Sequence, residues 1–581
     1  MMPKTTPRVI LVCLALGLVI FLSANSQTAE AQQIQVNAAD PPAAEQGTIN
    51  LNVKVTGKGF KNGAKAKWFV TGTTDPGGVT VNSTAFVSST ELTANITVSD
   101  MAVIANFDIQ VLNSDGRGGK GTELFAVTAK GGGQAACPAM QPAPTSDSKC
   151  YDFSSGCFDT TFGGTGFVTT DLPTSGEGAW AVVVQPDGKI IVAAQAQSAS
   201  TGWDFAVLRY NTDGSLDTSF GDPDPLNPLL RLGYTATALT VVSDWAKAML
   251  LQPDGKIVVA GSANSSQEMA AARYNVDGTL DSSFGSGGIV RVNFGNSRYV
   301  AEANDVGQQS DGKLILFGRA NAQFSFVRVN TNGSLDSNFG SGGKLTVNAS
   351  GAKNGTSNGL SLAFQRVPAV TGEERMVVGG LSKTSSNDNS DWTLMRLRPD
   401  GSTDTSFGTG GIVKTAFSGL DDQLKKLKVD SSNRIVAVGI INLNSPCGNY
   451  VGDSALVRYT QDGGLDGSFS GGKQIVDVYG GIDSFKGLSF QADGKILIAG
   501  DSYSSGIDQR ALHLSLIRFN ADGSRDASFG LLGNGVVTLD VTAYGGDLSA
   551  VVVQPTDGKI IVTGPVSNSG GALIAVGRYW P

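Results

Sequence analysis

The chain has 581 residues, with 76 glycines, 16% charged residues and a formal net charge of −8 at pH 7. Long runs of helix-forming residues are absent, while β-branched and aromatic residues are frequent, so the composition favours an all-β protein with many glycine turns. The acidic balance and the lack of a Lys/Arg cluster exclude nucleic acid and anionic membrane surfaces as expected partners.

The first residues have the pattern of a secretory signal peptide. Lys4 and Arg8 precede an apolar run at 9–22, and Ala29-Glu30-Ala31 is a small-x-small cleavage site. The alternative is a membrane anchor, but about fourteen apolar residues fall short of the ~20 that span a bilayer. We therefore expect cleavage after residue 31 and no transmembrane segment in the mature chain. We expect a protein that is secreted or held at the cell surface or in the periplasm.

Four cysteines remain after cleavage: Cys137, Cys150, Cys157 and Cys447. An even number in an exported protein permits two disulfides, with three connectivities that the sequence leaves open. The cysteine spacing is not that of a zinc site, and His513 is the one histidine of the chain.

Residues 34–130 alternate in polarity over short runs at 49–55, 66–71, 92–98, 106–112 and 123–127, with glycine and Asx turns between them. Such spacing predicts a β-sandwich of about 95 residues. The segments V-T-G-K-G-F-K-N-G-A (55–64), S-S-T-E-L-T-A-N-I (88–96) and F-D-I-Q-V-L-N-S-D-G-R (107–117) resemble the IPT/TIG family of immunoglobulin-like domains. The resemblance implies an extracellular spacer or protein-contact module. Residues 131–150 are rich in Gly, Ala, Pro and Ser and are expected to be a linker.

From residue 151 to 581 the sequence repeats with a period of about 60 residues. An L-D-x-S-F-G motif, a Q-P-D-G-K-I motif and an apolar run ending in Arg each occur seven times, two of the Q-P-D-G-K-I copies being degenerate. Each unit contains four strand-like runs, as at 288–292, 303–309, 313–318 and 324–329, and an Asp-Gly hairpin turn joins the middle two. Four short strands per unit in seven units predict a closed β-propeller with seven four-stranded blades, rather than a solenoid with capped ends.

The two ends of the repeat region complement each other. The last unit stops at Arg578-Tyr579 and lacks the L-D-x-S-F-G motif that follows this strand elsewhere, while a lone copy stands at 157–163. We expect 157–163 to lie against Arg578 and Tyr579 and to close the ring, which removes free sheet edges.

The L-D-x-S-F-G, Q-P-D-G-K-I-V-V-A-G and F-A-V-L-R-Y-N-x-D-G motifs resemble the bacterial delta-60 repeat proteins over about residues 157–579. This resemblance implies a propeller fold and supplies little about function.

Two sets of repeated polar residues are candidate sites. The arginine and the L-D-x-S-F-G aspartate of each unit are either a ring of ligand-binding charges or, as we expect, a structural ion pair that anchors the loop between blades. Some Asp-Gly turns place oxygen side chains at spacings that suit Ca²⁺, although a plain turn is the stronger interpretation. These weak calcium candidates are Asn211, Asp213, Asp217, Asn275, Asp277, Asp281, Asn520, Asp522 and Asp526.

No catalytic constellation is recognisable. A serine or cysteine triad needs a histidine, and His513 stands at a strand position that holds Asp204 and Asp391 in other units, which suggests a rim residue. We therefore expect a non-enzymatic, monomeric propeller without a cofactor, whose variable loops contact a protein or a glycan. The alternatives are a polysaccharide hydrolase or lyase acting in the propeller channel, and a calcium-stabilised surface-layer or matrix component.

Overall fold

The computed structural model describes residues 34–128 and 155–581, apart from positions 72, 75, 100, 101, 104, 228, 296–299, 354, 368–371, 386–387, 418–419, 445–449, 505–511, 531–532, 541–544 and 569–570. The chain divides into two compact units, Met1–Ala139 and Met140–Pro581. The described residues are all-β, with one three-residue 3₁₀ helix, η1 (Ser470–Gly472), and they contain no helix long and apolar enough to span a membrane.

The first unit contains two four-stranded sheets around one core. One sheet has the order β1 (Gln35–Asp40), β3 (Leu51–Lys58), β6 (Glu91–Val98), β5 (Val79–Ser88), and the other has the order β2 (Ala43–Glu45), β8 (Gly118–Thr128), β7 (Ala105–Leu112), β4 (Lys65–Val70). Every second residue of β6 is buried, as expected for a strand with one face in a core. Trp68 and Phe125 meet edge to face in that core, with ring centroids 5.9 Å apart.

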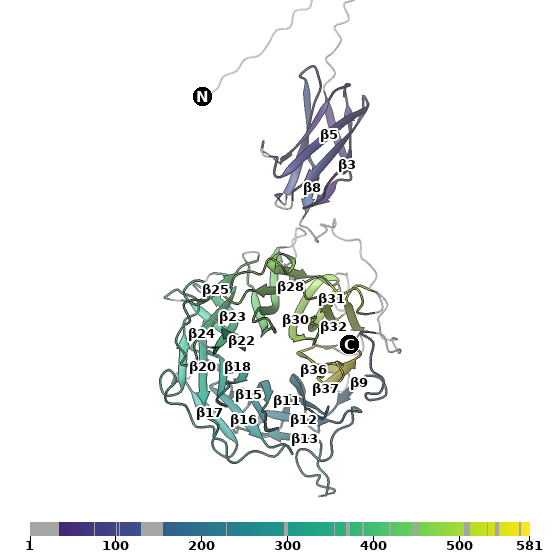
Figure 1. Ribbon diagram of the computed structural model, residues 1–581. Helices are drawn as coiled ribbons and strands as arrows, with labels where there is room; N and C mark the ends of the chain where they lie inside the picture. Colours follow the sequence, from purple (N-terminus) through teal and green to yellow (C-terminus); the bar gives the residue numbers. More distant parts are fainter. Residues whose placement is uncertain are drawn as a thin grey trace, which may run out of the picture. The chain divides into compact units, whose positions relative to one another are not determined.

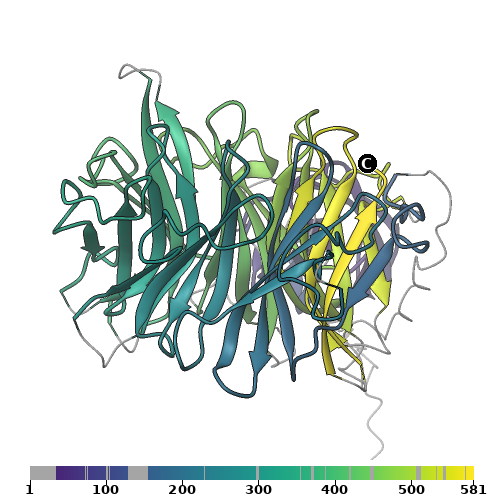
Figure 2. The same ribbon diagram turned by 90° about the horizontal axis from the view of Figure 1, so that it is seen from below.

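The second unit is a β-propeller, in which sheets are arranged as a ring around a central axis (Figures 1 and 2). Its first three sheets are β10 (Glu177–Val184), β11 (Ile190–Ser198), β12 (Gly202–Tyr210), β13 (Tyr234–Thr237); β14 (Trp245–Leu251), β15 (Ile257–Ala263), β16 (Glu268–Tyr274), β17 (Ile289–Asn293); and β18 (Ala301–Gln308), β19 (Leu314–Ala320), β20 (Gln323–Val329), β21 (Lys344–Val347).

The next three sheets are β22 (Thr356–Val367), β23 (Glu373–Lys383), β24 (Asp391–Leu397), β25 (Ile412–Thr415); β26 (Gln423–Val429), β27 (Ile435–Asn444), β28 (Tyr450–Tyr459), β29 (Lys473–Val476); and β30 (Gly480–Phe490), β31 (Ile496–Ser504), β32 (Leu512–Phe519), β33 (Val536–Asp540). The last sheet combines both ends of the repeat region in β34 (Gly545–Gly546), β35 (Ala550–Val553), β36 (Ile560–Asn568), β37 (Gly571–Tyr579) and β9 (Phe167–Thr170).

The sheets are one strand out of phase with the repeat units expected from the sequence. The run at 288–292 was grouped with the strands that follow it, but it forms β17 and pairs with β16, so it is the outer strand of the preceding sheet. The Asp-Gly turn therefore joins the two innermost strands of each sheet, as between β18 and β19. Gly312 has φ +85° in that turn, a conformation that favours glycine.

The expected closure of the ring is confirmed. β9 pairs antiparallel with β37, Phe158 forms a bridge with Tyr579, and the Asp159 N–H donates to the Arg578 carbonyl at 2.9 Å. The rings of Phe158 and Tyr579 are stacked with centroids 4.4 Å apart. Cys157, next to this contact, is disulfide-bonded, while Cys137, Cys150 and Cys447 lie outside the described residues.

Candidate functional site

The innermost strand of each sheet lines a central cavity, and a β-bulge in that strand exposes one side chain to it. In six sheets the register between the first two strands slips by one residue, which leaves one extra residue on the inner strand. The extra residues are Trp180, Lys247, Asn304, Leu360, Lys425 and Lys486. Ser549, immediately before β35, lines the cavity in the remaining sheet.

The glycine that ends the Q-P-D-G-K-I-V-V-A-G motif lies against this bulge in every unit except the first, which has Ala194 there. A Cβ on Gly439 would lie 2.2 Å from the Gln423 carbonyl oxygen and 2.7 Å from the Lys425 backbone nitrogen. A Cβ on Gly318 or Gly500 would lie as close to the carbonyl of the facing strand. This repeated glycine therefore shapes the cavity wall. The sequence alone did not show why the motif contains it.

The seven cavity residues occupy the same position in each repeat unit but have different side chains. Each lies five residues before the first position of the Q-P-D-G-K-I motif, which is Gln in six units and Asp430 in the other. The set contains three lysines, one tryptophan, one asparagine, one leucine and one serine. Sequence reasoning missed this site, although an alignment of the repeats would have shown one position of variable chemistry at a fixed distance from the Q-P-D-G-K-I motif.

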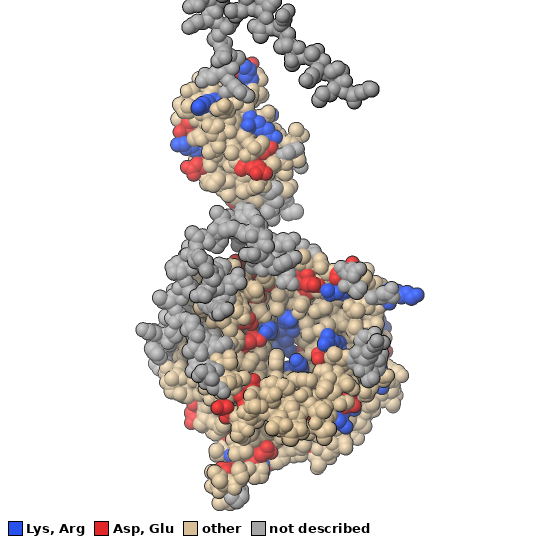
Figure 3. Space-filling view, turned by 180° about the vertical axis from the view of Figure 1, so that it is seen from behind, with Lys and Arg blue, Asp and Glu red and all other residues tan. Residues whose placement is uncertain are grey.

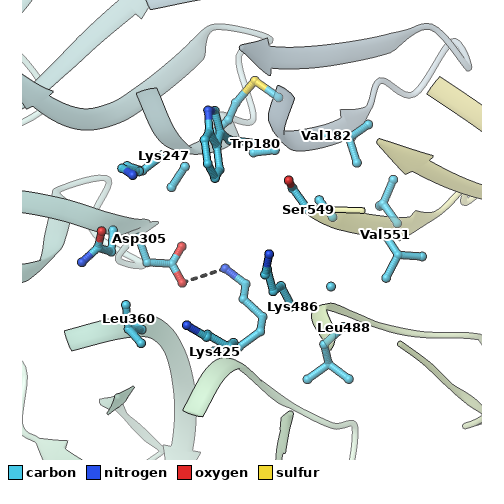
Figure 4. A pocket seen from close by; sticks show the side chains of 18 of the residues that line it. Trp180, Val182, Lys247, Asp305, Leu360, Lys425, Lys486, Leu488, Ser549 and Val551 are labelled. Carbon is cyan, nitrogen blue, oxygen red and sulfur yellow. Dashed lines mark hydrogen bonds and ion pairs between the residues drawn. The ribbon is translucent and has the colours of Figure 1, made fainter. Parts of the chain in front are cut away.

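The cavity has a volume of about 370 Å³ and is lined by basic and apolar groups. Figure 3 shows basic side chains gathered in the central hollow, although the whole chain is acidic. In Figure 4, Trp180, Lys247, Lys425 and Lys486 surround the open space, with Leu360, Leu488 and Val551 between them. The site thus combines cationic groups with apolar contact surface.

Two of its lysines are neutralised by carboxylates. Lys426 pairs with Asp305 at 2.8 Å, and this carboxylate also accepts from Ser361 Oγ at 2.9 Å. Lys486 pairs with Asp547 and lies 3.8 Å from Asp501. Burial alone would lower the pKa of Lys486, but Asp547 and Asp501 raise it above its usual value.

Three further lysines have no ion pair with any carboxylate of the described residues: Lys247, Lys425 and Lys428. Burial lowers the pKa of Lys425 to about 8, with repulsion from Lys486 adding to the effect. Burial likewise lowers the pKa of Lys428 to about 8, with repulsion from Lys426. The fold thus holds ammonium groups close together without matching negative charge, an arrangement that an anion would stabilise.

Trp180 and Lys247 come from adjacent sheets and form a mixed aromatic and cationic surface. The Lys247 ammonium lies 4.8 Å from the centre of the Trp180 ring. Trp180 is the extra residue of the β-bulge in β10, and Lys247 is the extra residue of the β-bulge in β14, so their contact depends on both bulges.

The repeated arginines and aspartates serve the fold, as the structural interpretation expected. In every unit the Arg Nε lies 2.7 or 2.8 Å from an Asp carboxylate, and the guanidinium carbon lies 4.3–4.8 Å from the centre of the L-D-x-S-F-G phenylalanine ring. Arg209 and Arg273 also donate to backbone carbonyls of the following unit, at Val276 and Thr331. The arginine therefore ties neighbouring sheets together.

The calcium candidates of the Asp-Gly turns lie in three such loops and have protein partners. Asp217 is paired with Arg209 and Lys189, Asp213 accepts from Ser215, and Asn211 donates to Ser215. The loops with Asn275, Asp277, Asp281 and with Asn520, Asp522, Asp526 repeat these contacts. Calcium binding at these loops stays a prediction.

His513 is buried at 4% exposure rather than at a rim, because β33 covers the outer edge of β32 at this position. Its ring lies 4.9 Å from the ring of Tyr479. Of the variable loops expected to carry specificity, residues 386–387, 445–449 and 505–511 lie outside the described residues, so that expectation also stays a prediction.

Comparison with known proteins supports the propeller and identifies no activity. A family model described as a domain of unknown function (DUF5122) beta-propeller matches residues 185–220, 252–284, 309–339, 375–407, 431–469 and 491–529. No curated protein matches the chain.

Three of the solved structures that resemble this chain are structures of enzymes. A polysaccharide lyase, ulvan lyase bound to -[GlcA(1-4)Rha3S]-, is 11% identical over 71% of this chain and 95% of its own, with a TM-score of 0.38. An α-L-arabinanase from Penicillium chrysogenum is 10% identical over 57% and 91%, with a TM-score of 0.34. An exo-β-1,3-galactanase from Clostridium thermocellum is 10% identical over 71% and 96%, with a TM-score of 0.26.

These names correct the expectation that the chain is not an enzyme. That expectation rested on the lack of a recognisable catalytic constellation, and the similar structures include a polysaccharide lyase, an arabinanase and a galactanase.

Proposed function

We propose that this protein is an exported propeller that binds an acidic saccharide in its central cavity. The observation that carries the proposal is the set of Lys247, Lys425 and Lys428, which face one cavity without a carboxylate partner among the described residues. Because the chain as a whole is acidic, a local concentration of positive charge attracts anions to this point rather than to the general surface.

The remaining lining suits a sugar ring that bears the anionic group. Trp180 offers a flat aromatic face beside Lys247, and Asn304 and Ser549 offer hydrogen-bonding groups. A volume of about 370 Å³ is within the range of small-ligand sites, which are mostly apolar with a few convergent polar groups. A uronate or sulfate-ester saccharide combines these features, since it has an apolar ring face, hydroxyl groups and a negative charge.

The proposal also assigns the two structural units of the chain and its export. We take the seven sheets as the blades of a delta-60-type propeller and the first unit as an IPT/TIG-like immunoglobulin-like domain. The sequence motifs quoted above support both assignments, together with the ring of sheets and the two-sheet unit. Export is supported by the n-region, apolar run and cleavage site at residues 1–31, and by the disulfide bond of Cys157.

The test is calorimetric titration of the full chain with a short oligouronate and with a neutral oligosaccharide of equal length, at pH 7 and low salt. We expect the acidic ligand alone to bind. The paired substitution Lys425→Gln and Lys428→Gln should weaken binding at least tenfold, whereas Lys353→Gln, which removes an exposed charge outside the cavity, should leave it unchanged.

Absence of binding, or binding that the paired substitution leaves intact, would refute the cavity as an acidic-saccharide site. Chromatography of the same mixtures determines whether the bound saccharide is also cleaved.

A further inference from the structure

A second site lies away from the cavity, where three aspartates from two adjacent sheets converge. We propose that Asp453, Asp477 and Asp483 bind one Ca²⁺ ion between these sheets. One carboxylate oxygen of each residue lies within 4.8 Å of the others. Asp453 lies on β28, Asp477 follows β29, and Asp483 lies on β30 of the next sheet, so a bound ion would join the two sheets.

The two inner carboxylates are buried with unused oxygen atoms. Asp453 is 7% exposed and Asp483 is fully buried, and Oδ1 of each accepts no hydrogen bond among the described residues. Ser502, which lies opposite Asp483 on β31, is also fully buried, and its hydroxyl is directed at the Asp483 carboxylate. Buried polar atoms almost always have partners, so a group of such oxygens around one point favours the binding of a cation there.

The repeat supplies an internal comparison for Asp483. Asp244, immediately before β14, holds the equivalent place, and both of its oxygens are used: Oδ2 accepts from the N–H groups of Leu239 and Thr240, and Oδ1 accepts from Thr240 Oγ1 and the Asn264 N–H. Asp483 keeps only the first of these contacts, from the Val478 N–H at 2.9 Å.

Two substitutions relative to the other repeats distinguish this interface. Tyr479 stands where Thr240 stands in the Asp244 loop, and its hydroxyl donates to Thr538 Oγ1 at 3.0 Å instead of to the aspartate. Asp477 stands where the equivalent loops have Ala238 and Ala416. Compared with the Asp244 loop, the Asp483 loop has lost a hydrogen-bond donor to its aspartate and gained a second carboxylate. This combination favours cation binding over the hydrogen bonds that stabilise the Asp244 loop.

The local charge also lacks balance. Arg525 is a basic neighbour, and its Nη2 donates to the Asp477 carbonyl oxygen at 2.7 Å. One guanidinium cannot balance three carboxylates, and a divalent cation supplies the remaining charge.

The donor set selects the metal. Carboxylate and hydroxyl oxygens are hard ligands that suit Ca²⁺, and the cluster contains none of the sulfur or nitrogen ligands that zinc or copper prefer. Asp477 is exposed, so its side of the site faces solvent, which can complete the shell of six to eight oxygens that Ca²⁺ takes.

The experiment uses the full chain after dialysis against a chelator and back into metal-free buffer. Calorimetric titration with CaCl₂ should show one ion bound per chain, and thermal unfolding should shift to higher temperature with added Ca²⁺. Asp477→Ala introduces the residue of the equivalent loops at an exposed position, so it should fold and should weaken Ca²⁺ binding at least tenfold. Asp453→Asn is the second variant, with the same expectation.

The matched control is Asp522→Asn in one of the Asp-Gly turns, which should bind Ca²⁺ as the unaltered chain does. Three results would overturn the proposal: no Ca²⁺ uptake by the unaltered chain, unchanged uptake by both Asp477→Ala and Asp453→Asn, or uptake lost in Asp522→Asn alone. The last would assign calcium to the Asp-Gly turns. Saccharide binding is not a readout here, so failure of the cavity proposal would leave this result unaffected.

Discussion

Arg578 and Asp159 come from opposite ends of the propeller and form an ion pair of 2.7 Å, the same length that Arg209 and Asp217 have within one unit. Both partners are buried, at 3% and 0% exposure. The contact that closes the ring is therefore made with the same side chains and geometry as the contacts that build each unit. The junction of the two chain ends is one more copy of the repeated interface.

The first prediction tests this junction. Asp159→Asn leaves Arg578 buried without its negative partner, and breaking one side of a buried pair costs about 3–5 kcal/mol. Urea unfolding should show a loss of that order, whereas Asp187→Asn in an exposed turn should stay within about 0.5 kcal/mol of the unaltered chain. Equal midpoints for the two variants would show that the ion pair does not stabilise closure.

The second prediction concerns acid. Burial would raise the pKa of Asp159, but hydrogen bonds from Thr161 and Lys559 and the charge of Arg578 lower it, and the equivalent aspartates Asp217, Asp281 and Asp526 are shifted the same way. The unfolded chain therefore binds protons at a higher pH than the folded chain does. This stabilisation is complete well above the unfolded value of 3.8 and is lost as the pH falls below it.

Urea midpoints measured from pH 6 to pH 2 should therefore fall most steeply below about pH 4. Asp526→Asn should lower the midpoint at pH 6 and show a shallower decline, since one proton-linked group is removed. A midpoint independent of pH between 5 and 2 would contradict the ion-pair account.

The third prediction concerns the bulge. Gly439→Ala places a methyl group 2.2 Å from the Gln423 carbonyl, so β26 must shift and the bulge with Lys425 is displaced. We expect a stability loss of about 1–3 kcal/mol, as for overpacked sites, together with weaker oligouronate binding. Gly467→Ala, where a Cβ would meet nothing within 4 Å, should leave both quantities unchanged.

The fourth prediction concerns the pH dependence of ligand binding. The pKa values of Lys425 and Lys428 lie at about 8, so both are mostly charged at pH 7 and mostly neutral at pH 9. A bound anion favours the charged forms, so binding takes up protons near pH 8 and weakens above it. Titrations should show a loss on the order of tenfold between pH 7 and pH 9, and the paired Lys→Gln variant should lose this dependence.

Much of the propeller could be predicted because its signals are local and repeated. The Asp-Gly turns, the Arg–Asp pairs and the complementary ends follow from motifs that recur at fixed spacing. The grouping of strands into sheets could not be predicted. The run that forms β17 has the same alternation of polar and apolar residues whether it pairs with the strand before it or with the strand after it. Only its hydrogen bonding to β16 decides the assignment.

The candidate sites could not be predicted for a different reason. Trp180 and Lys425 hold equivalent positions in their units but differ in residue type, and only the ring arrangement of the sheets brings them to one cavity. Asp453 and Asp483 belong to different sheets, and their missing hydrogen bonds appear only when the surrounding atoms are placed. Motif searches detect residues that repeat, whereas these sites consist of residues that depart from the repeat.

The bulge also has an evolutionary consequence. Because each of the seven cavity residues lines the central cavity, its identity is less constrained than that of the residues that build the repeated core of the unit. Seven codons, one per unit, can therefore change independently while the ring stays intact. A lineage of such propellers could acquire a new ligand by point mutation at these positions, without inventing a loop or a domain.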